Sequence, residues 1–541
     1  MSIEQKIQTM FPRENEIPEF AKLPKPVELC EYLIDGELRK WNGPFQEVTS
    51  PIEIVSEGGV LKPARLGHYP RLGEKQAMEA LDAACRAWDN GMGAWPTMGV
   101  DERIRAVLDF VRRMKERRTE VARLLMWEIG KNKADSEKEF DRTIDYLLDT
   151  IEALKDLDRT SSRFTIQQGI IGQIRRAPLG VVLSMGPFNY PLNETFTTLL
   201  PALIMGNTVV VKPAKFGVLL FGPLMEAFHQ SFPKGVVNFV FGEGPELIPP
   251  LMASGKVDVL AFIGSSRVAD QLKKAHPNPH RLLGVLGLDA KNPGIILGDA
   301  DLDLAVKECL LGSLSYNGQR CTALKILFVE RKVVDVFLQR FSAGVEALSF
   351  GMPWENAALT PLPETGKTDY LSALVKDAEA HGAKVVNPHG GLKNGTFFFP
   401  AVLCAVNAKM RVYHEEQFGP VVPIVPFDDI HEPLEYIIQS KYGQQASLFG
   451  SDPERLARLV DPLVNQVSRL NLNSQCQRGP DTFPFTGRKD SAERTLSVSD
   501  ALRVFSIRTL VAAKAGALNE EILNRIVRER RSKFLSTDYI F

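Results

Sequence analysis

Cysteine is scarce in this sequence, and no two cysteines stand close enough to form a metal-binding or redox pair. The 541 residues include six cysteines and no C-x-x-C motif. Structural zinc or a disulfide framework requires cysteines at recognisable spacings, so we expect free thiols in a reducing compartment and no metal site. The six are Cys30, Cys85, Cys309, Cys321, Cys404 and Cys476.

Long apolar runs and an excess of one charge are missing too. No segment approaches the ~18 apolar residues of a membrane span, and the N-terminal segment has no apolar core of a signal peptide. We therefore expect a cytoplasmic protein without membrane association. The formal net charge of -1 gives no general attraction to nucleic acid. The length predicts two or more domains, and 44% hydrophobic with 24% charged residues is typical of a globular protein.

One cysteine has a polar setting that suits chemistry better than packing. Cys321 lies in the segment YNGQRCTA, directly after Arg320. A thiolate is the reactive form of cysteine, and a neighbouring cation lowers the pKa that controls its formation. Cys321 is therefore a candidate nucleophile. One motif does not identify an enzyme, and a lone cysteine is more often inert.

Apolar runs alternate with helical patterns through the middle of the chain. Runs at 180–186, 208–212, 236–241 and 257–263 are typical of strands buried on both faces, and helical patterns separate them. This alternation predicts βαβ units, a parallel sheet and an α/β fold. Short runs at 294–297 and 326–329 begin a second α/β region.

Other segments fall outside this alternation. Two long amphipathic helices are expected at 100–131 and 133–154, and a hairpin at 161–176. The tail at 518–541 begins as a charged helix. That helix is either a solvated surface or an arm that packs on a neighbouring subunit.

The ends of the predicted strands carry residues suited to a dinucleotide. Ligands of open α/β sheets bind beyond the carboxyl ends of the strands, and a helix N-terminus offers free N–H groups to phosphate. No G-x-G-x-x-G follows the first strand, so the usual dinucleotide fingerprint is absent. The candidate cofactor-binding residues at these ends are Pro187, Phe188, Lys212, Lys215, Gly242, Gly264 and Ser265.

Six segments together resemble the aldehyde dehydrogenase superfamily from about residue 31 to residue 511. Within it, the chain is most similar to the non-phosphorylating, NADP-dependent glyceraldehyde-3-phosphate dehydrogenases. The resemblance implies two doubly wound parallel-sheet domains and a small β extension for oligomerisation. The segments are PLGVVLSMGPFNYPLN, TVVVKPAK, FIGSS, NGQRCTA, EEQFGPV and RGPDTFPFTGRKDS.

The resemblance also implies the domain limits and the assembly. A dinucleotide-binding domain would comprise 1–157 and 177–286, and a catalytic domain 287–497. Segments 158–176 and 498–541 would form an oligomerisation and C-terminal arm. A homo-oligomer, either a dimer or a tetramer, is expected.

The resemblance implies a covalent mechanism in which an aldehyde is oxidised to an acid. Cys321 would form a thiohemiacetal and then a thioester, while the Asn189 side chain and the Cys321 N–H stabilise the oxyanion. Glu416 would hold the nicotinamide ribose with Phe418 packed nearby. Lys215 stands where related NAD enzymes often have a glutamate, which would repel a 2′-phosphate. The positive charge of Lys215 would instead attract that phosphate, which favours NADP, with NAD still possible.

The same resemblance places several polar residues around the substrate. The arginine fork matches phosphate oxygens, so three converging arginines would suit a phosphorylated aldehyde such as glyceraldehyde 3-phosphate. Each arginine by itself is more often an ion-pair partner. The residues are Arg142, Tyr190, Arg320 and Arg478.

One departure from the family pattern affects the release of the acid. The glutamate that activates the deacylating water in the superfamily corresponds to Gly287 here, and Asp289 is the nearest carboxylate. In an extended segment the two positions point the same way about 6.6 Å apart, so we expect Asp289 to replace the base. Two alternatives stay open: an enzyme that passes the acyl group to coenzyme A, and a catalytically silent structural or binding member of the superfamily.

Overall fold

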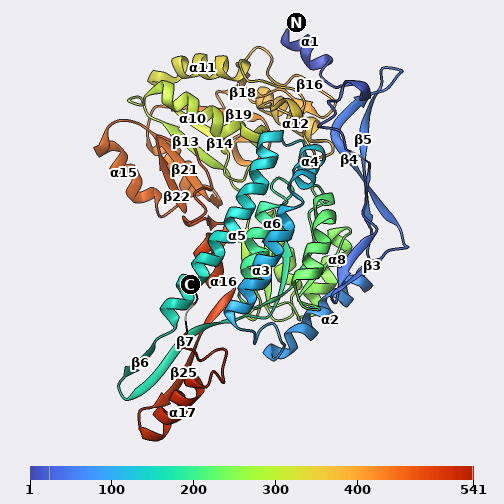
Figure 1. Cartoon of the computed structure of the whole chain (residues 1–541). Helices are drawn as coiled ribbons and strands as arrows, with labels where there is room; N and C mark the ends of the chain where they lie inside the picture. Colours follow the sequence, from blue (N-terminus) through green and yellow to red (C-terminus); the bar gives the residue numbers. More distant parts are fainter. Residues whose placement is uncertain (24, 539, 541) are drawn as a thin grey trace.

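Two large sheets built mainly of parallel strands form the centre of the molecule (Figure 1). The computed structural model describes residues 1–23, 25–538 and 540, so that Tyr539 and Phe541 of the predicted C-terminal arm lie outside it. The first sheet has six strands, parallel except at the β24 edge. Their order is β10 (Val237–Phe239), β9 (Thr208–Val211), β8 (Val181–Met185), β11 (Val259–Ile263), β12 (Leu283–Gly287) and β24 (Ala492–Glu493).

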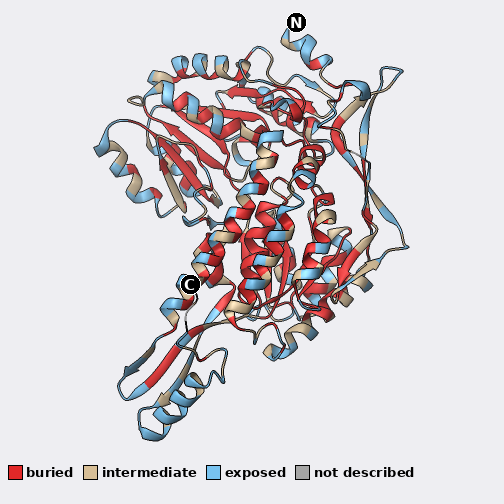
Figure 2. Ribbon diagram, in the orientation of Figure 1, coloured by how far each residue is buried: buried red, intermediate tan, exposed pale blue. Residues whose placement is uncertain are grey.

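The second sheet has seven strands and is parallel except where β15 pairs with β18. Its order is β15 (Lys384–Val385), β18 (Ala401–Cys404), β19 (Val421–Phe427), β14 (Leu324–Glu330), β13 (Asn292–Ile296), β21 (Gln445–Phe449) and β22 (Arg469–Leu472). Every residue of β8, β9, β13 and β21 is buried, as helices on both faces require (Figure 2). The two sheets confirm the predicted α/β class.

The helices of the first sheet agree with the predicted alternation, with one local difference. The pattern at 218–229 predicts one helix, but a 3-10 helix Leu219–Leu224 precedes a short α7 (Met225–Ser231). Pro223 lies inside this segment and has no N–H to donate, which disfavours a continuous α-helix. The other helices around this sheet are α2 (Glu74–Trp88), α6 (Asn193–Ile204), α8 (Gly244–Ala253) and α9 (Ser266–Ala275).

The prediction of a single helix at 100–131 is wrong, because the chain turns partway along this segment. It forms α3 (Val100–Lys115) and α4 (Arg118–Ile129), which ends at Gly130 with φ 65°. A straight helix buries one stripe, whereas α4 has buried residues at nearly every position of its last two turns. The next helix, α5 (Lys133–Ser161), begins at the cap Asn132 and runs beyond its predicted end.

The helices that cover the second sheet complete a two-domain arrangement. They are α10 (Leu302–Leu314), α11 (Arg331–Glu346), α12 (Lys367–Ala380), α14 (His431–Gln439) and α15 (Pro453–Leu463). The N-terminal region adds α1 (Ile3–Gln8), β1 (Val27–Glu28), β2 (Glu31–Ile34), β3 (Glu37–Lys40) and the long hairpin of β4 (Phe45–Val55) and β5 (Leu61–Pro70).

A third, antiparallel sheet projects from the molecule as an arm (Figure 1). The expected hairpin is β6 (Phe164–Gln167) and β7 (Ile170–Pro178), and β25 (Ser506–Lys514) pairs with β7 along its whole length. The tail continues as α17 (Ala517–Arg528), which has no buried residue.

Two short elements connect the regions that the sequence assigns to different domains. The strand β24 belongs to the first sheet although it lies within 287–497. The helix α16 (Val498–Val504), expected in the arm, has a buried face and lies against α5 and α6. The domain limits as a whole stay a prediction. None of the helices in the described ranges combines the length and apolarity needed to cross a bilayer.

Candidate active site

One cavity of about 870 Å³ lies between the two large sheets, beyond the carboxyl ends of their strands. It brings together residues that are far apart in the sequence. Of the predicted site residues, Lys212 and Gly242 do not line it. Those that do are Arg142, Pro187, Phe188, Asn189, Tyr190, Lys215, Gly264, Ser265, Asp289, Arg320, Cys321, Glu416, Phe418 and Arg478.

A tight backbone turn presents Cys321 to this cavity. Three consecutive residues, Tyr316, Asn317 and Gly318, have φ of 49°, 55° and 71°. Left-handed φ costs a non-glycine residue about 1–2 kcal/mol, so tertiary contacts must hold the turn. The Asn317 amide provides one, because it donates to Thr360 Oγ1 at 3.1 Å and accepts from the Thr360 N–H at 2.9 Å. A Cβ on Gly318 would lie 2.7 Å from a carbonyl oxygen, which explains the glycine.

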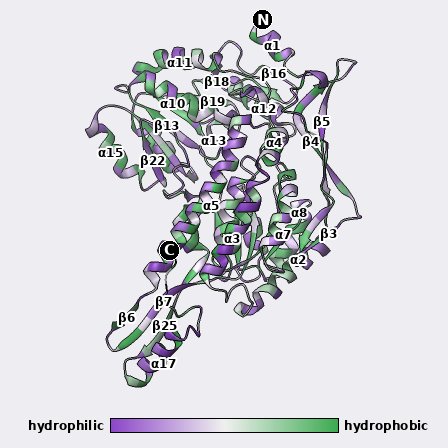
Figure 3. Cartoon of the chain, viewed as in Figure 1, coloured by the Kyte–Doolittle hydropathy of each residue, from purple (hydrophilic) through white to green (hydrophobic). Residues whose placement is uncertain are grey.

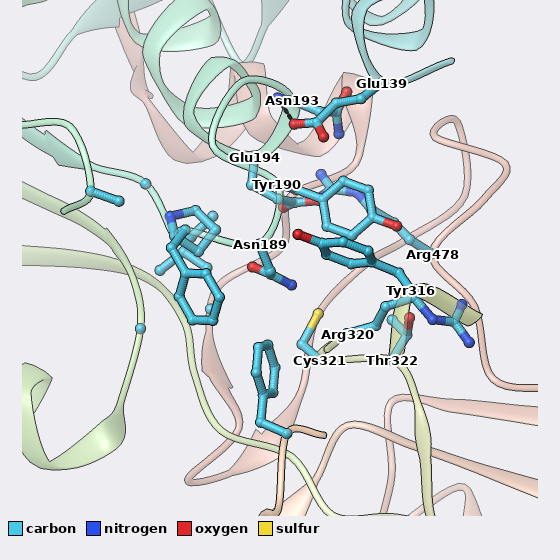
Figure 4. Close-up of a pocket in the computed structure, with 18 of the residues that line it drawn as sticks. Glu139, Asn189, Tyr190, Asn193, Glu194, Tyr316, Arg320, Cys321, Thr322 and Arg478 are labelled. Atoms are coloured by element: carbon cyan, nitrogen blue, oxygen red, sulfur yellow. Dashed lines mark hydrogen bonds and ion pairs between the residues drawn. The ribbon is translucent and has the colours of Figure 1, made fainter. Parts of the chain in front are cut away.

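The amide expected to stabilise an oxyanion lies beside this turn. Asn189 Nδ2 donates to the Gln319 carbonyl at 2.8 Å, two residues before the thiol. Within the described part of the chain, the Cys321 N–H donates no hydrogen bond. The two donors therefore lie on the same side of the cavity as the thiol, as Figure 4 shows for Asn189 and Cys321.

A buried ion pair positions the Asn189 loop. Lys131 and Glu139 are paired with both side chains fully buried. Lys131 Nζ donates to the Asn189 carbonyl at 2.8 Å and lies 3.6 Å from the centre of the Tyr190 ring. Glu139 accepts from the N–H groups of Leu192 and Asn193 at 3.1 and 3.2 Å. These contacts leave the loop little freedom to move away from Cys321.

The charges around the thiol differ from the sequence prediction. Burial raises the pKa of Cys321, the carboxylate of Glu194 adds to that shift, and Lys325 and Arg478 oppose it. Arg320, the neighbour in sequence, is not among these influences. Its guanidinium donates to the carbonyls of Leu311 and Gly312 at 3.1 and 2.9 Å, and Figure 4 shows it turned away from the sulfur. The thiol pKa is therefore raised by burial and not lowered as the adjacent arginine had led us to expect.

Two of the predicted substrate-binding arginines belong to a buried charge network. Arg142 binds both oxygens of Asp481, at 2.8 and 2.7 Å. Arg478 pairs with Glu194 and lies 3.3 Å from Asp481. Although burial opposes it, the hydrogen bond from Arg142 and the charge of Arg478 hold the pKa of Asp481 below its usual value. The two arginines do converge, but each already has a carboxylate partner.

Sequence analysis did not single out Glu194 or Asp481. Glu194 comes five residues after Asn189, and Asp481 three residues after Arg478, so both lie in segments that carry family motifs. The signal that could have found Glu194 and Asp481 is a carboxylate close in sequence to residues expected to bind an anion. The Nε atom of Arg320 is buried without a hydrogen-bond acceptor among the described residues. Such a donor suits a bound ligand that brings acceptor oxygens.

Glu416 has a well-defined place at the other end of the cavity. It pairs with Lys325 and accepts from the Ala290 N–H at 3.3 Å. Burial raises the pKa of Glu416, and the charge of Lys325 opposes this rise. Lys291 Nζ holds the surrounding loop by donating to the Val412 and Glu415 carbonyls at 2.7 and 2.6 Å.

Two aromatic rings face each other near Glu416. The Phe188 and Phe418 rings lie 5.7 Å apart at 66°, an edge-to-face arrangement. Phe188 follows β8 of the first sheet, while Phe418 belongs to the loop before β19 of the second. A flat ring of a cofactor that reached Cys321 would pass between these two sides.

Two lysines follow the end of β9. Burial lowers the pKa of Lys212 to about 8, with Glu243 opposing and the positive charge of Lys215 contributing. An anion between the two lysines would relieve their repulsion, so the pair fits a phosphate group. Gly264 and Ser265 precede α9, and the Ser265 hydroxyl caps the Val268 N–H.

Asp289 has a different environment from the one predicted. Its Oδ2 accepts from the Ser266 N–H at 2.8 Å and from the Ser266 hydroxyl at 2.7 Å, so the carboxylate caps the start of α9. A Cβ on Gly287 would meet the Ile263 side chain at 3.4 Å, which is ordinary contact. Crowding does not explain the missing glutamate at position 287. Asp289 as a replacement base stays a prediction.

Comparisons with known proteins agree with this geometry. Residues 58–509 match the Aldehyde dehydrogenase family. The chain is 36% identical over 346 residues to the NADP-dependent glyceraldehyde-3-phosphate dehydrogenase of Streptococcus equinus, covering 64% of this chain and 70% of that protein. It is 30% identical over 388 residues to the D-glyceraldehyde dehydrogenase (NADP(+)) of Thermoplasma acidophilum, covering 70% and 78%.

A solved structure extends the similarity to the whole fold. The NADP-dependent glyceraldehyde-3-phosphate dehydrogenase of Bacillus halodurans C-125, complexed with NADP, is 30% identical and superposes with a TM-score of 0.82. The match covers 90% of this chain and 100% of that one. The predicted aldehyde dehydrogenase-like fold is confirmed. On the extent of these matches, the chain belongs to the aldehyde dehydrogenase family.

Proposed function

We propose that this protein oxidises glyceraldehyde 3-phosphate to 3-phosphoglycerate with NADP. The observation that carries the proposal is the position of Cys321 beside the Asn189 amide, in a cavity that also contains arginines and Lys215. The named relatives act on this class of aldehyde. The intact cysteine and amide argue against a catalytically silent member of the family.

The chain's own residues account for the covalent step. The Cys321 sulfur attacks the aldehyde carbon, and the former carbonyl oxygen becomes an oxyanion. The Cys321 N–H and the Asn189 amide, released from the Gln319 carbonyl, donate to that oxygen. Loss of one such donor costs about 3 kcal/mol in other enzymes. Lys131 and Glu139 contribute by holding the Asn189 loop in place.

The residues at the strand ends fit a dinucleotide. NADP, when bound, accepts the hydride from the substrate carbon. Glu416 would accept from hydroxyls of the nicotinamide ribose, and Phe188 and Phe418 would enclose the ring. Lys212 and Lys215 would hold the adenosine ribose and its 2′-phosphate. Pro187, Gly242, Gly264 and Ser265 would line the path of the dinucleotide between these ends.

The substrate phosphate would lie near Arg142, Arg320, Arg478 and Tyr190. The Nε atom of Arg320, which has no acceptor among the described residues, is a donor that remains for it. A specific observation favours a second candidate, non-phosphorylated D-glyceraldehyde. Arg142 and Arg478 are already neutralised by Asp481 and Glu194, so a phosphate dianion would have to displace these carboxylates. One of the related proteins is named for this smaller substrate.

A third possibility follows from the missing glutamate, because an acyl transfer to coenzyme A needs no activated water. One assay separates the three. Purified protein is mixed with NADP and either glyceraldehyde 3-phosphate or D-glyceraldehyde, without inorganic phosphate or coenzyme A, and NADPH absorbance is followed. Multiple turnovers with the phosphorylated aldehyde support the proposal. Higher kcat/KM with D-glyceraldehyde favours the second candidate, and turnover only after coenzyme A is added would refute both.

We also propose a homo-oligomer in the cytoplasm. The six cysteines are all free thiols, which agrees with a reducing compartment. Several apolar residues of the arm sheet are exposed, and a second subunit would cover them. In Figure 3 the ribbon of the arm shows hydrophobic segments in green among hydrophilic segments in purple.

A further inference from the structure

We propose that Lys325 is a positioning residue that joins the nucleophile to the cofactor-binding loop, because its ammonium group contacts both. The lysine is the second residue of β14, just after Cys321, whereas Glu416 lies in the loop before β19. The inference rests on the proposed function, since it requires Glu416 to hold the ribose of a bound dinucleotide.

The ammonium group of Lys325 has partners in two segments of the chain. It pairs with Glu416 Oε1 and lies 3.4 Å from the Cys321 carbonyl oxygen, to which it donates. It also lies 5.1 Å from the centre of the Phe418 ring, which is expected beside the nicotinamide. The lysine side chain is only 2% exposed. A buried ammonium group is costly unless it is paired, so these contacts hold it in one place.

The contact with Lys325 decides which oxygen of Glu416 is free. The lysine and the Ala290 N–H both donate to Oε1, the second at 3.3 Å. No residue that the structure describes donates to Oε2. The Glu416 side chain is 13% exposed and lines the cavity. Lys325 therefore orients the carboxylate and leaves one oxygen to accept from a ribose hydroxyl.

The second contact fixes the backbone of the nucleophile. The Cys321 carbonyl accepts from Lys325 and, at 2.8 Å, from the Asn292 amide, which also donates to the Ala323 carbonyl at 3.1 Å. A separate backbone contact joins the same two segments, because the Gln417 amide donates to the Lys325 carbonyl at 2.9 Å. That contact does not need the lysine side chain, so we expect a variant at this position to keep the loop in place.

Other cations near this loop have different partners. Lys291 Nζ donates to two backbone carbonyls and to a side-chain amide oxygen, all of them neutral. Lys367 and Arg478 pair with carboxylates other than Glu416. Within the described part of the chain, Lys325 is therefore the cation that the carboxylate and the nucleophile share.

The charge of Lys325 acts on the same two groups. Burial and Glu194 raise the pKa of Cys321, and Lys325 is the largest of the influences that lower it. Burial also raises the pKa of Glu416, and Lys325 is again the largest opposing influence. A variant without this charge should therefore lose both thiolate and ionised carboxylate.

Two measurements on the enzyme without aldehyde test the two contacts. Lys325→Met removes the ammonium group but keeps a long, unbranched side chain. We expect NADP, titrated by protein fluorescence, to bind about tenfold more weakly, because Glu416 loses the partner that orients it. We expect iodoacetamide to alkylate Cys321 about two- to tenfold more slowly at pH 8, because a nearby positive charge is lost. Lys307→Met, on the exposed face of α10, is the matched control.

A double-mutant cycle separates positioning from a general structural effect. Since Lys325 acts on NADP through Glu416, Lys325→Met should change the NADP affinity by less than about twofold in a Glu416→Gln background. Alkylation should still slow in this background, because the charge acts on the thiol directly. Lys325→Arg keeps a cation and should be alkylated faster than Lys325→Met between pH 6 and 10.

Several results would overturn the assignment. They are unchanged NADP affinity or unchanged alkylation in Lys325→Met, additive losses of affinity in the cycle, and equal alkylation of the Met and Arg variants. Should Lys325→Met lose the melting transition of the wild type, Lys325→Gln takes its place with the same expected slowing of alkylation. A wild-type enzyme that neither binds NADP nor forms NADPH would instead refute the proposed function, so the two failures are distinguishable.

Discussion

At the level of single residues, the charges that act on Cys321 are not the one adjacent to it in sequence. Arg320 is adjacent but turns to backbone carbonyls, while Lys325 and Arg478 reach the thiol from the start of β14 and a distant loop. The pKa of the thiol is raised because burial and Glu194 outweigh these cations. Below its pKa, the thiolate fraction of such a group rises with pH, so reactivity should increase toward alkaline pH.

Removing charges near Cys321 should change alkylation in opposite directions. At pH 8, Glu194→Gln lowers the thiol pKa and should speed iodoacetamide alkylation, whereas Lys325→Gln raises it and should slow alkylation. We expect changes of roughly two- to tenfold in each direction, since one pKa unit changes the thiolate fraction tenfold. Rates are measured by mass spectrometry between pH 6 and 10. Lys307→Gln, on the exposed face of α10, should leave the profile unchanged, and identical profiles for all variants would contradict the electrostatic account.

At the level of elements, the arm is notable because its strands leave apolar side chains exposed. Ile174 of β7 lies opposite Leu510 of β25, and these side chains are 38% and 55% exposed. A three-stranded sheet with apolar residues on its open face gains free energy when a second copy covers it.

Leu510→Asp should therefore weaken or abolish the oligomer. A charge placed in an apolar interface is costly unless it finds a partner. Sedimentation velocity should show a shift from a multiple of the 60.1 kDa chain toward the monomer. Val336→Asp introduces the same charge at an exposed position of α11 and should not change the mass. An unchanged oligomer in Leu510→Asp would exclude this face as the interface.

For the molecule as a whole, NADP should act as a bridge between the two sheet domains, because the proposed contacts come from both. Lys215 follows a strand of the first sheet, while Glu416 and Phe418 precede β19 of the second. A ligand that binds only the folded state stabilises it by about 2.7 kcal/mol at 100 times its dissociation constant.

Saturating NADP should raise the melting temperature of the wild type more than NAD at equal concentration. Lys215→Glu should reverse this order, because a carboxylate repels the 2′-phosphate and accepts from the 2′-hydroxyl of NAD. Differential scanning fluorimetry with both cofactors provides the measurement. Lys75→Glu, on the exposed side of α2, should retain the wild-type order. A wild type that prefers NAD would remove the argument for NADP.

Much of the fold was predictable because it depends on local patterns. The buried parallel strands have continuous apolar runs, and the hairpin of β6 and β7 has its turn at Gln168 and Gly169, both with positive φ. The break between α3 and α4 was not predictable, since it depends on how α4 packs among its neighbours. For the site, motifs located Cys321, Asn189 and Glu416, but side-chain directions could not be inferred from order in the chain.

The residue types alone were enough to predict the α/β class and the family and to single out Cys321 as the candidate nucleophile, because periodicity and short motifs record local backbone preferences and reactive groups. The pairing of Arg142 and Arg478 with carboxylates, the turning away of Arg320 and the capping of α9 by Asp289 emerged only from the folded chain. Long-range ion pairs connect residues separated by up to hundreds of positions, and no local pattern specifies which partners meet.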